Sequence, residues 1–152
     1  MSTGDSLAGF TQALAAAMAM LGWRTEAGTG AGSSLPAVGM RRRVSISLHV
    51  VSGPSLRLTL DLGPAALAAG WLQMMGRAPT ADEMPAMAGE VAAELLNQLA
   101  GKFAGELGKA DMLVELATPM SAPVEPVSPW ISLVREHAGE RVSVFLSRAE
   151  PA

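Results

Sequence analysis

The chain has 152 residues, 49% of them hydrophobic, a length that suits one domain with a real core, residues 1–152, rather than two domains of ordinary size. Its formal net charge of -3 gives no sign of nucleic-acid binding. The absence of cysteine excludes a disulfide framework and thiolate metal sites, and it is compatible with the reducing cytoplasm, where we expect the protein to be.

The first predicted element is an amphipathic helix from Leu7 to Leu21. Apolar residues repeat there at helical spacing: Leu7, Phe10, Leu14, Ala17, Met18 and Leu21. Asp5 or Ser6 is the expected N-cap, and Gly22 is the expected C-terminal end. No Lys or Arg precedes the segment, which argues against an export signal, and it is shorter than a membrane span. We therefore expect it to pack on the domain, with no membrane partner.

A β-hairpin is predicted next. The segment from Gly28 to Gly39 is rich in Gly, Ser and Pro and is expected to be a loop. We interpret the basic run from Arg41 to Arg43 as a solvated strand entry rather than as a contact for phosphate or an acidic partner. Apolar residues then alternate with polar ones from Val44 to Val50 and from Leu56 to Leu62, which is strand periodicity. Gly53-Pro54 supplies the turn between them.

Two helices are predicted in the middle of the chain. Pro64 starts the first helix, which passes through Trp71 and ends at Gly76. Thr80 and Glu83 have the spacing of a capping box, which opens the second and longest helix. Pro85 must then lie in the first turn of that helix or bend it.

The C-terminal third is predicted to be mostly strand. Met112 to Leu116 alternates as a strand, Thr118 to Pro129 is a proline-rich linker, and the strands Ile131–Leu133 and Val142–Leu146 close a hairpin around residues 137–140. Strands and helices do not alternate singly along the chain. We therefore expect an α+β fold of two layers, with helices on one face of a mostly antiparallel sheet.

The longest helix carries a polar stripe, formed by Glu90, Glu94, Asn97 and Gly101, which fall within an arc of roughly 60°. Its opposite side is apolar and must be buried, so the stripe is expected to be exposed. The residues that border the stripe are small: Ala93, Ala100, Ala104 and Gly105. Such borders allow another backbone to approach closely, and an acid one turn from a carboxamide can grip a cation and orient a water.

The alternative is that Glu94 and Asn97 are ordinary solvated residues. Gly101 favours a functional reason for the stripe, because a glycine inside a helix costs about 1 kcal/mol relative to alanine. Other chemistry finds little support in the sequence. His49 and His137 lack acidic or histidine partners at metal-ligand spacing, and no nucleophile-elbow or phosphate-loop pattern occurs. The methionines are interpreted as core residues rather than as a binding groove.

The helix 90–107, EVAAELLNQLAGKFAGEL, resembles the signature helix of the CheC/CheX/FliY chemotaxis phosphatases. That family has Glu-x-x-Asn followed by a small residue and Gly, which Glu94, Asn97 and Ala100-Gly101 match. Glu90 departs from the pattern, because it stands where the family usually has Asp or Ser. The resemblance extends to residues 72–76 and 80–83 before the helix and to 114–119 after it. The single copy of the motif resembles CheX within that family.

The resemblance implies hydrolysis of the aspartyl-phosphate on a CheY-like receiver domain. Asn97 would hold the attacking water, and Glu94 would pair with a lysine of the receiver. The remaining residues expected at the partner interface are Glu90, Ala93, Ala100, Gly101 and Ala104. The Mg²⁺ would belong to the receiver, so no metal or cofactor of the chain's own is expected.

The resemblance also implies a homodimer formed by edge-strand pairing, for which Val44–Val50 and Val142–Leu146 are the expected edges. Two alternatives to catalysis remain. The same fold can serve as a non-catalytic adaptor or dimerisation module, or as an assembly domain associated with secretion.

Overall fold

The computed structural model describes residues 3–23, 26–27, 42–51, 53–121, 131–137 and 140–148. Its helices are α1 (Thr3–Met20), α2 (Pro64–Met75) and α3 (Glu83–Lys109). Its strands are β1 (Glu26–Ala27), β2 (Arg42–Val50), β3 (Ser55–Leu62), β4 (Val114–Leu116), β5 (Met120–Ser121), β6 (Ile131–His137) and β7 (Glu140–Arg148). The predicted loop 28–39 and residues 122–129 of the predicted linker lie outside the described residues.

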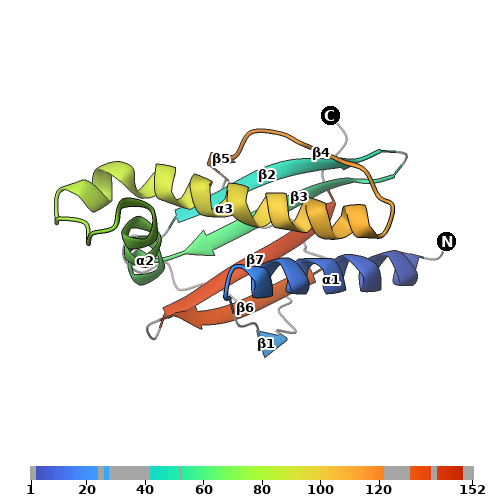
Figure 1. The fold of residues 1–152 in the computed structure, drawn as a ribbon, viewed down its shortest axis with the longest axis horizontal. Coiled ribbons are helices and arrows are strands. Elements are labelled where there is room, and N and C mark those ends of the chain that lie inside the picture. Colours follow the sequence, from blue (N-terminus) through green and yellow to red (C-terminus); the bar gives the residue numbers. More distant parts are fainter. Residues whose placement is uncertain are drawn as a thin grey trace.

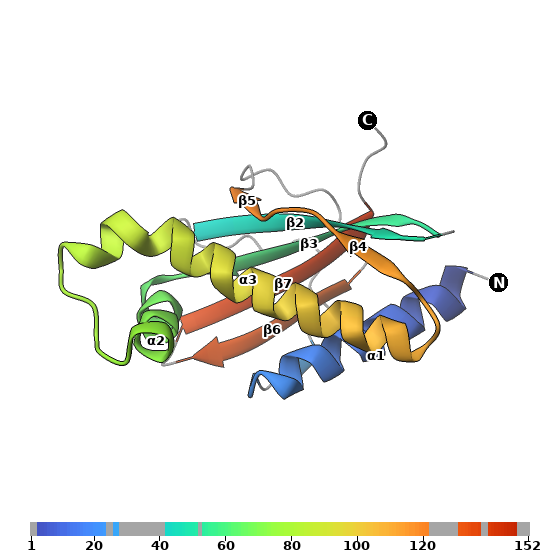
Figure 2. The same cartoon turned by 45° about the horizontal axis from the view of Figure 1, so that its top comes forward.

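The strands form a single antiparallel sheet, and the helices cover one of its faces (Figures 1 and 2). The strand order is β1-β6-β7-β3-β2-β4, and β5 also pairs with β2. The hairpin register places Val44 opposite Leu60 and Leu48 opposite Leu56, so the apolar residues of both strands share a face. The expected α+β architecture of two layers is confirmed.

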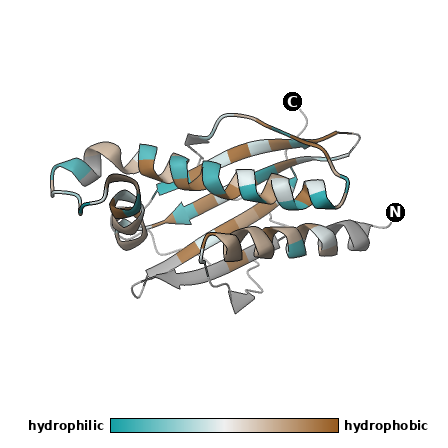
Figure 3. Ribbon diagram, viewed as in Figure 1, coloured by the Kyte–Doolittle hydropathy of each residue, from teal (hydrophilic) through white to brown (hydrophobic). Residues whose placement is uncertain are grey.

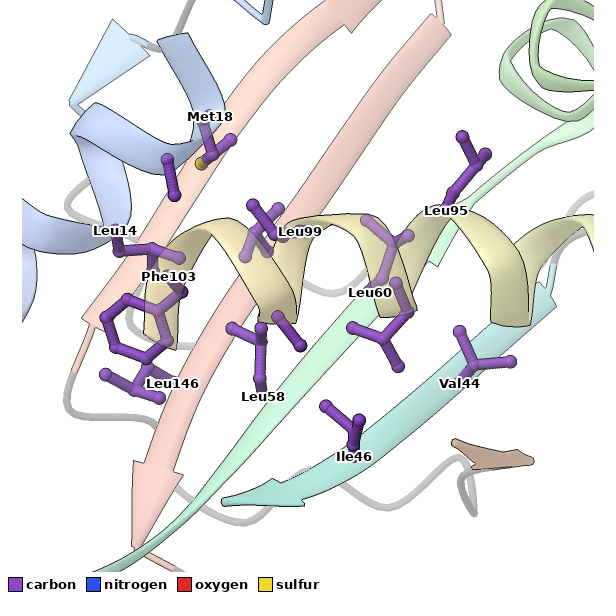
Figure 4. Close-up of a cluster of buried hydrophobic side chains, with 14 of the residues drawn as sticks. Leu14, Met18, Val44, Ile46, Leu58, Leu60, Leu95, Leu99, Phe103 and Leu146 are labelled. Carbon is purple, nitrogen blue, oxygen red and sulfur yellow. The ribbon is translucent and has the colours of Figure 1, made fainter. Parts of the chain in front are cut away.

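The core lies between α3 and the sheet. Figure 4 shows Leu95, Leu99 and Phe103 of α3 among side chains of β2, β3 and β7. Leu14 and Met18 of α1 lie beside Phe103 and Leu99 and are completely buried. The buried side of α3 is therefore held by the sheet and by α1 together, which fixes the direction in which the other side of α3 points.

The predicted first helix exists and packs on the core, but its start was predicted wrongly. The structure begins α1 at Thr3, so Asp5 and Ser6 lie in its first turn and neither is the N-cap. Its end agrees with the prediction. Gly22 has a left-handed φ of 78°, and the Trp23 N–H donates to the carbonyl of Met18 at 2.9 Å.

The capping-box prediction is confirmed at the entry to α3. The Thr80 N–H donates to Oε1 of Glu83 at 3.0 Å, and the Glu83 N–H donates to Oγ1 of Thr80 at 3.2 Å. Arg77 binds both carboxylate oxygens of Glu83, at 2.7 and 2.6 Å. These contacts from Arg77 and Thr80 lower the pKa of Glu83 to about 2. Pro85 lies in the first turn of α3, where its missing N–H costs no hydrogen bond.

Two predictions about the strands are wrong. Val44–Val50 and Val142–Leu146 are not edges, because β2 lies between β3 and the strands β4 and β5, and β7 lies between β3 and β6. Arg43 is also not a solvated entry residue. Its Nε donates to Oδ2 of Asp61 at 3.0 Å, its side chain is only 14% exposed, and its guanidinium lies over the ring of Phe145.

Candidate functional site

The polar stripe of α3 faces solvent, as the helical period predicts. Glu90, Glu94, Asn97 and Gly101 are all exposed. The residues between them on the other side of the helix are buried, among them Leu95, Leu96 and Leu99. Figure 3 shows hydrophilic residues recurring along the outward side of α3, away from the sheet. A rigid helix therefore presents the carboxylate and the carboxamide side by side on an open surface.

The small residues around the stripe differ in their exposure to solvent. Ala93 and Ala104 are half-buried, so part of each remains at the flank of the stripe. Gly101 and Gly105 are exposed, and a Cβ added to either would meet nothing within 4 Å. No crowding within the chain therefore requires glycine at these two positions.

The prediction that Ala100 contacts the partner is wrong. Its exposure is 0%, so it belongs to the core and cannot contact a partner. On a helix that packs on a sheet and beside a second helix, the buried arc widens to include such a border residue. Seven residues were proposed for the site from the sequence. Six of them lie on or beside the exposed face of α3, and Ala100 lies in the core.

Gln98 is a neighbour of the site that the sequence interpretation missed. Its Nε2 donates to Oε1 of Glu94 at 3.4 Å. The signal was present in the sequence, because residues four apart on a helix are neighbours, and Gln98 follows Glu94 by four. Among the described residues, no Lys or Arg forms an ion pair with Glu90 or Glu94.

The site is a convex helix surface rather than a cavity. A pocket of about 220 Å³ lies between the end of α1, α2 and the sheet, but none of the seven predicted site residues lines it. Among the described residues, no cluster of three His, Cys, Asp or Glu side chains is placed to hold a metal ion. No described helix is long and apolar enough to cross a membrane.

This geometry limits the chemistry that α3 can perform alone. Asn97 offers one donor and one acceptor group, and Glu94 offers a carboxylate. Small-molecule sites bury most of their ligand in a concave pocket, and an exposed helix face does not. The pair can orient a water or hold a cation only against a second surface, which a macromolecular partner would have to supply.

Comparison with known proteins gives a consistent result at the level of the fold. No family model matches the sequence, and no curated protein matches it. Among solved structures, CheX from Vibrio vulnificus is similar with a TM-score of 0.65 and 13% identity, over 93% of this chain and 97% of that one. A CheC-like superfamily protein from Shewanella sp. PV-4 has a TM-score of 0.63 and 15% identity, over 99% of this chain and 100% of that one.

A third similar structure is a complex of CheX with CheY, BeF₃ and Mg²⁺ from Borrelia burgdorferi. It matches with a TM-score of 0.63 and 14% identity, over 93% of this chain and 96% of that one. In each case nearly the whole of both chains is matched, so the likeness covers the complete arrangement of helices and sheet. The chain therefore has the fold of the CheX and CheC-like chemotaxis proteins.

Proposed function

We propose that this protein is a member of the CheX-like phosphatases and hydrolyses the aspartyl-phosphate of a CheY-like receiver domain. The observation that carries the proposal is the exposure of Glu94 and Asn97 on one face of α3, within a CheX-like fold. Both residues match the family's motif, and both are at the surface, where a partner can reach them. The structure from Borrelia burgdorferi, in which CheX is bound to CheY with BeF₃ and Mg²⁺, supports a receiver domain as the partner.

The mechanism follows from what an acyl phosphate requires. Phosphoryl transfer depends mainly on an attacking oxygen held in line and on neutralised charge. The carboxamide oxygen of Asn97 accepts a hydrogen bond from a water and so aims the oxygen of that water at phosphorus. Glu94 pairs with a lysine of the receiver and fixes the register of the two surfaces. The resemblance to the family implies that the Mg²⁺ needed to neutralise the charge of the phosphoryl group would be bound by the receiver.

The small side chains around the pair set how near the partner can come. Gly101 adds no bulk beside Asn97, and Ala93 and Ala104 add only methyl groups at the flank. Glu90 lies one turn before Glu94 and extends the acidic surface toward the partner. We place the reaction in the cytoplasm and expect a homodimer in which each subunit keeps its polar stripe open to its own receiver domain.

The decisive experiment is the hydrolysis of a phosphorylated receiver domain with and without this protein. Acceleration over the receiver's own rate is expected, with dependence on Mg²⁺. Loss of phosphate at the same rate in both samples would refute catalysis. Binding of the receiver without acceleration would instead assign the protein to the adaptor role.

A further inference from the structure

The outward surface of α3 carries a row of four side chains, each one turn after the last: Glu90, Glu94, Gln98 and Lys102. Gln98 is half-buried and the other three are exposed. In such a row each side chain reaches the next, because residues four apart on a helix are neighbours. Two acidic residues come first and a lysine comes last. Gln98 separates the acidic part of the row from the basic residue.

The usual partner for a helical glutamate is a lysine four residues later, and such a pair holds the carboxylate in an internal ion pair. Here that position is Gln98, whose Nε2 donates to Oε1 of Glu94 at 3.4 Å. An amide donates a hydrogen bond without adding positive charge. The carboxylate is thereby oriented along the helix but keeps its full attraction for a cation from outside the chain.

From this arrangement we infer that Gln98 is a positioning residue for Glu94. This inference rests on the proposed function of the stripe. Gln98 holds the Glu94 carboxylate in one orientation, and Lys102 lies a further turn along the helix. The carboxylate then meets the cationic group of the partner without first leaving an ion pair within its own helix. The residue therefore acts on recognition of the receiver, and the hydrolytic step itself depends on Asn97.

The test measures hydrolysis over a range of phosphorylated receiver concentrations, with the full chain and with Gln98→Lys. The new lysine is expected to capture Glu94 and to raise the half-saturating receiver concentration roughly twofold to fivefold, the range of an exposed ion pair. The maximal rate should stay the same, and the effect should shrink in high salt because exposed charges are screened. Gln12→Lys is the matched control, because it makes the same charge change on an exposed part of α1.

The double variant Glu94→Ala/Gln98→Lys separates positioning from a general effect of charge. In the absence of Glu94, the lysine at position 98 should have no further effect beyond that of Gln12→Lys. Equal behaviour of Gln98→Lys and Gln12→Lys would overturn the inference, as would an undiminished effect of Gln98→Lys in the Glu94→Ala background. A wild-type protein that accelerates no hydrolysis would instead refute the proposed function, so the two failures are distinct.

Discussion

Asn97 lies on the solvent side of α3, so its role can be tested without disturbing the fold. We expect Asn97→Ala to remove most of the acceleration of receiver dephosphorylation, because the attacking water loses its hydrogen-bond partner. The free energy of unfolding should change by no more than about 0.5 kcal/mol, as is usual for a surface substitution. Hydrolysis assays and thermal melts measure the two effects separately. Dephosphorylation at the wild-type rate by this variant would eliminate the proposed mechanism.

Glu94 has a different expected role, which is to recognise the partner rather than to activate water. Glu94→Lys places a positive charge against the proposed receiver lysine, so binding should weaken through repulsion. Hydrolysis should fall mainly at low receiver concentration and recover in part when the receiver is in excess. Titration calorimetry with the receiver gives the affinity directly. If this variant binds as tightly as the wild type, Glu94 lies outside the interface.

At the scale of the element, α3 contains a glycine whose replacement should separate stability from function. A Cβ at Gly101 meets nothing within 4 Å, so Gly101→Ala should raise the free energy of unfolding by about 0.5–1 kcal/mol. The same methyl group lies beside Asn97 on the proposed docking surface, so the half-saturating receiver concentration should rise. Chemical denaturation and the hydrolysis assay measure these opposite effects.

Gly89→Ala is the matched control for this prediction. Gly89 is in the same helix, is exposed, and also has nothing within 4 Å of an added Cβ. It lies roughly 120° around the helix from Gly101, away from the polar stripe. It should stabilise the protein similarly and leave hydrolysis unchanged. Equal hydrolysis by the two variants would show that the partner does not approach α3 closely at Gly101.

The entry to α3 gives a prediction that depends on pH. The pKa of Glu83 is about 2 in the folded protein and 4.5 ordinarily, because Arg77 and Thr80 bind the ionised carboxylate. A lowered pKa means that the carboxylate stabilises the fold above pH 4.5, and that this stabilisation is lost as the pH falls from 4.5 to 2. The wild type should therefore be more stable than Glu83→Gln at about pH 7, with the difference closing toward about pH 2.

Urea denaturation of both proteins across this pH range is the measurement. Arg77→Gln provides the control, because without the guanidinium the difference between glutamate and glutamine at position 83 should largely disappear. A difference between wild type and Glu83→Gln that stays constant with pH would show that the ion pair does not stabilise the start of α3.

Local patterns predicted the elements well. The division of α3 into an exposed and a buried side follows from the period of a single helix, and the β2–β3 hairpin follows from alternation on both sides of Gly53-Pro54. The burial of Ala100 could not be predicted this way, because alanine is neither clearly polar nor clearly apolar. Whether such a border residue is covered depends on the elements that pack beside α3.

The ion pair between Arg43 and Asp61 could have been predicted from a local pattern, the register of the hairpin. The hairpin register places Arg43 directly opposite Asp61, which a count back from the turn would have shown. The charged run at the start of β2 instead suggested solvent. The motif residues Glu94 and Asn97 were found first by their helical spacing and then by resemblance, whereas Gln98 had no counterpart in the motif and was identified through its contact with Glu94.

At the scale of the whole molecule, the strand order could not be obtained from neighbouring residues. β3 pairs with β2 on one side and with β7 on the other, although β7 follows β3 by two helices and three further strands. That long-range pairing places β7 inside the sheet, and the pairing of β2 with β4 and β5 does the same for β2. Strand order depends on pairings between segments that are far apart in the sequence, so local patterns do not reveal it.

The expectation of a homodimer stays a prediction, with the proposed edges changed. Among the described strands, the sheet ends at β1 on one side and at β4 on the other. Leu113, just before β4, and Leu116, its last residue, are exposed apolar residues. Open sheet edges favour pairing with a second chain. Light scattering at micromolar concentration should give the mass of two chains. The mass of one chain under these conditions would contradict the prediction.

The same segment of α3 contributes to the core on one side and to the proposed docking surface on the other, which limits the insertions and deletions that it tolerates. Leu95, Leu99 and Phe103 anchor one side of the helix while Glu94, Asn97 and Gly101 occupy the other, and each further residue turns the helix by about 100°. One residue inserted between Glu94 and Phe103 would swing everything beyond it out of phase, so that either the core or the docking surface would be lost. Loops tolerate changes in length, but we expect no insertion or deletion within these ten positions in homologues that keep both the fold and the function.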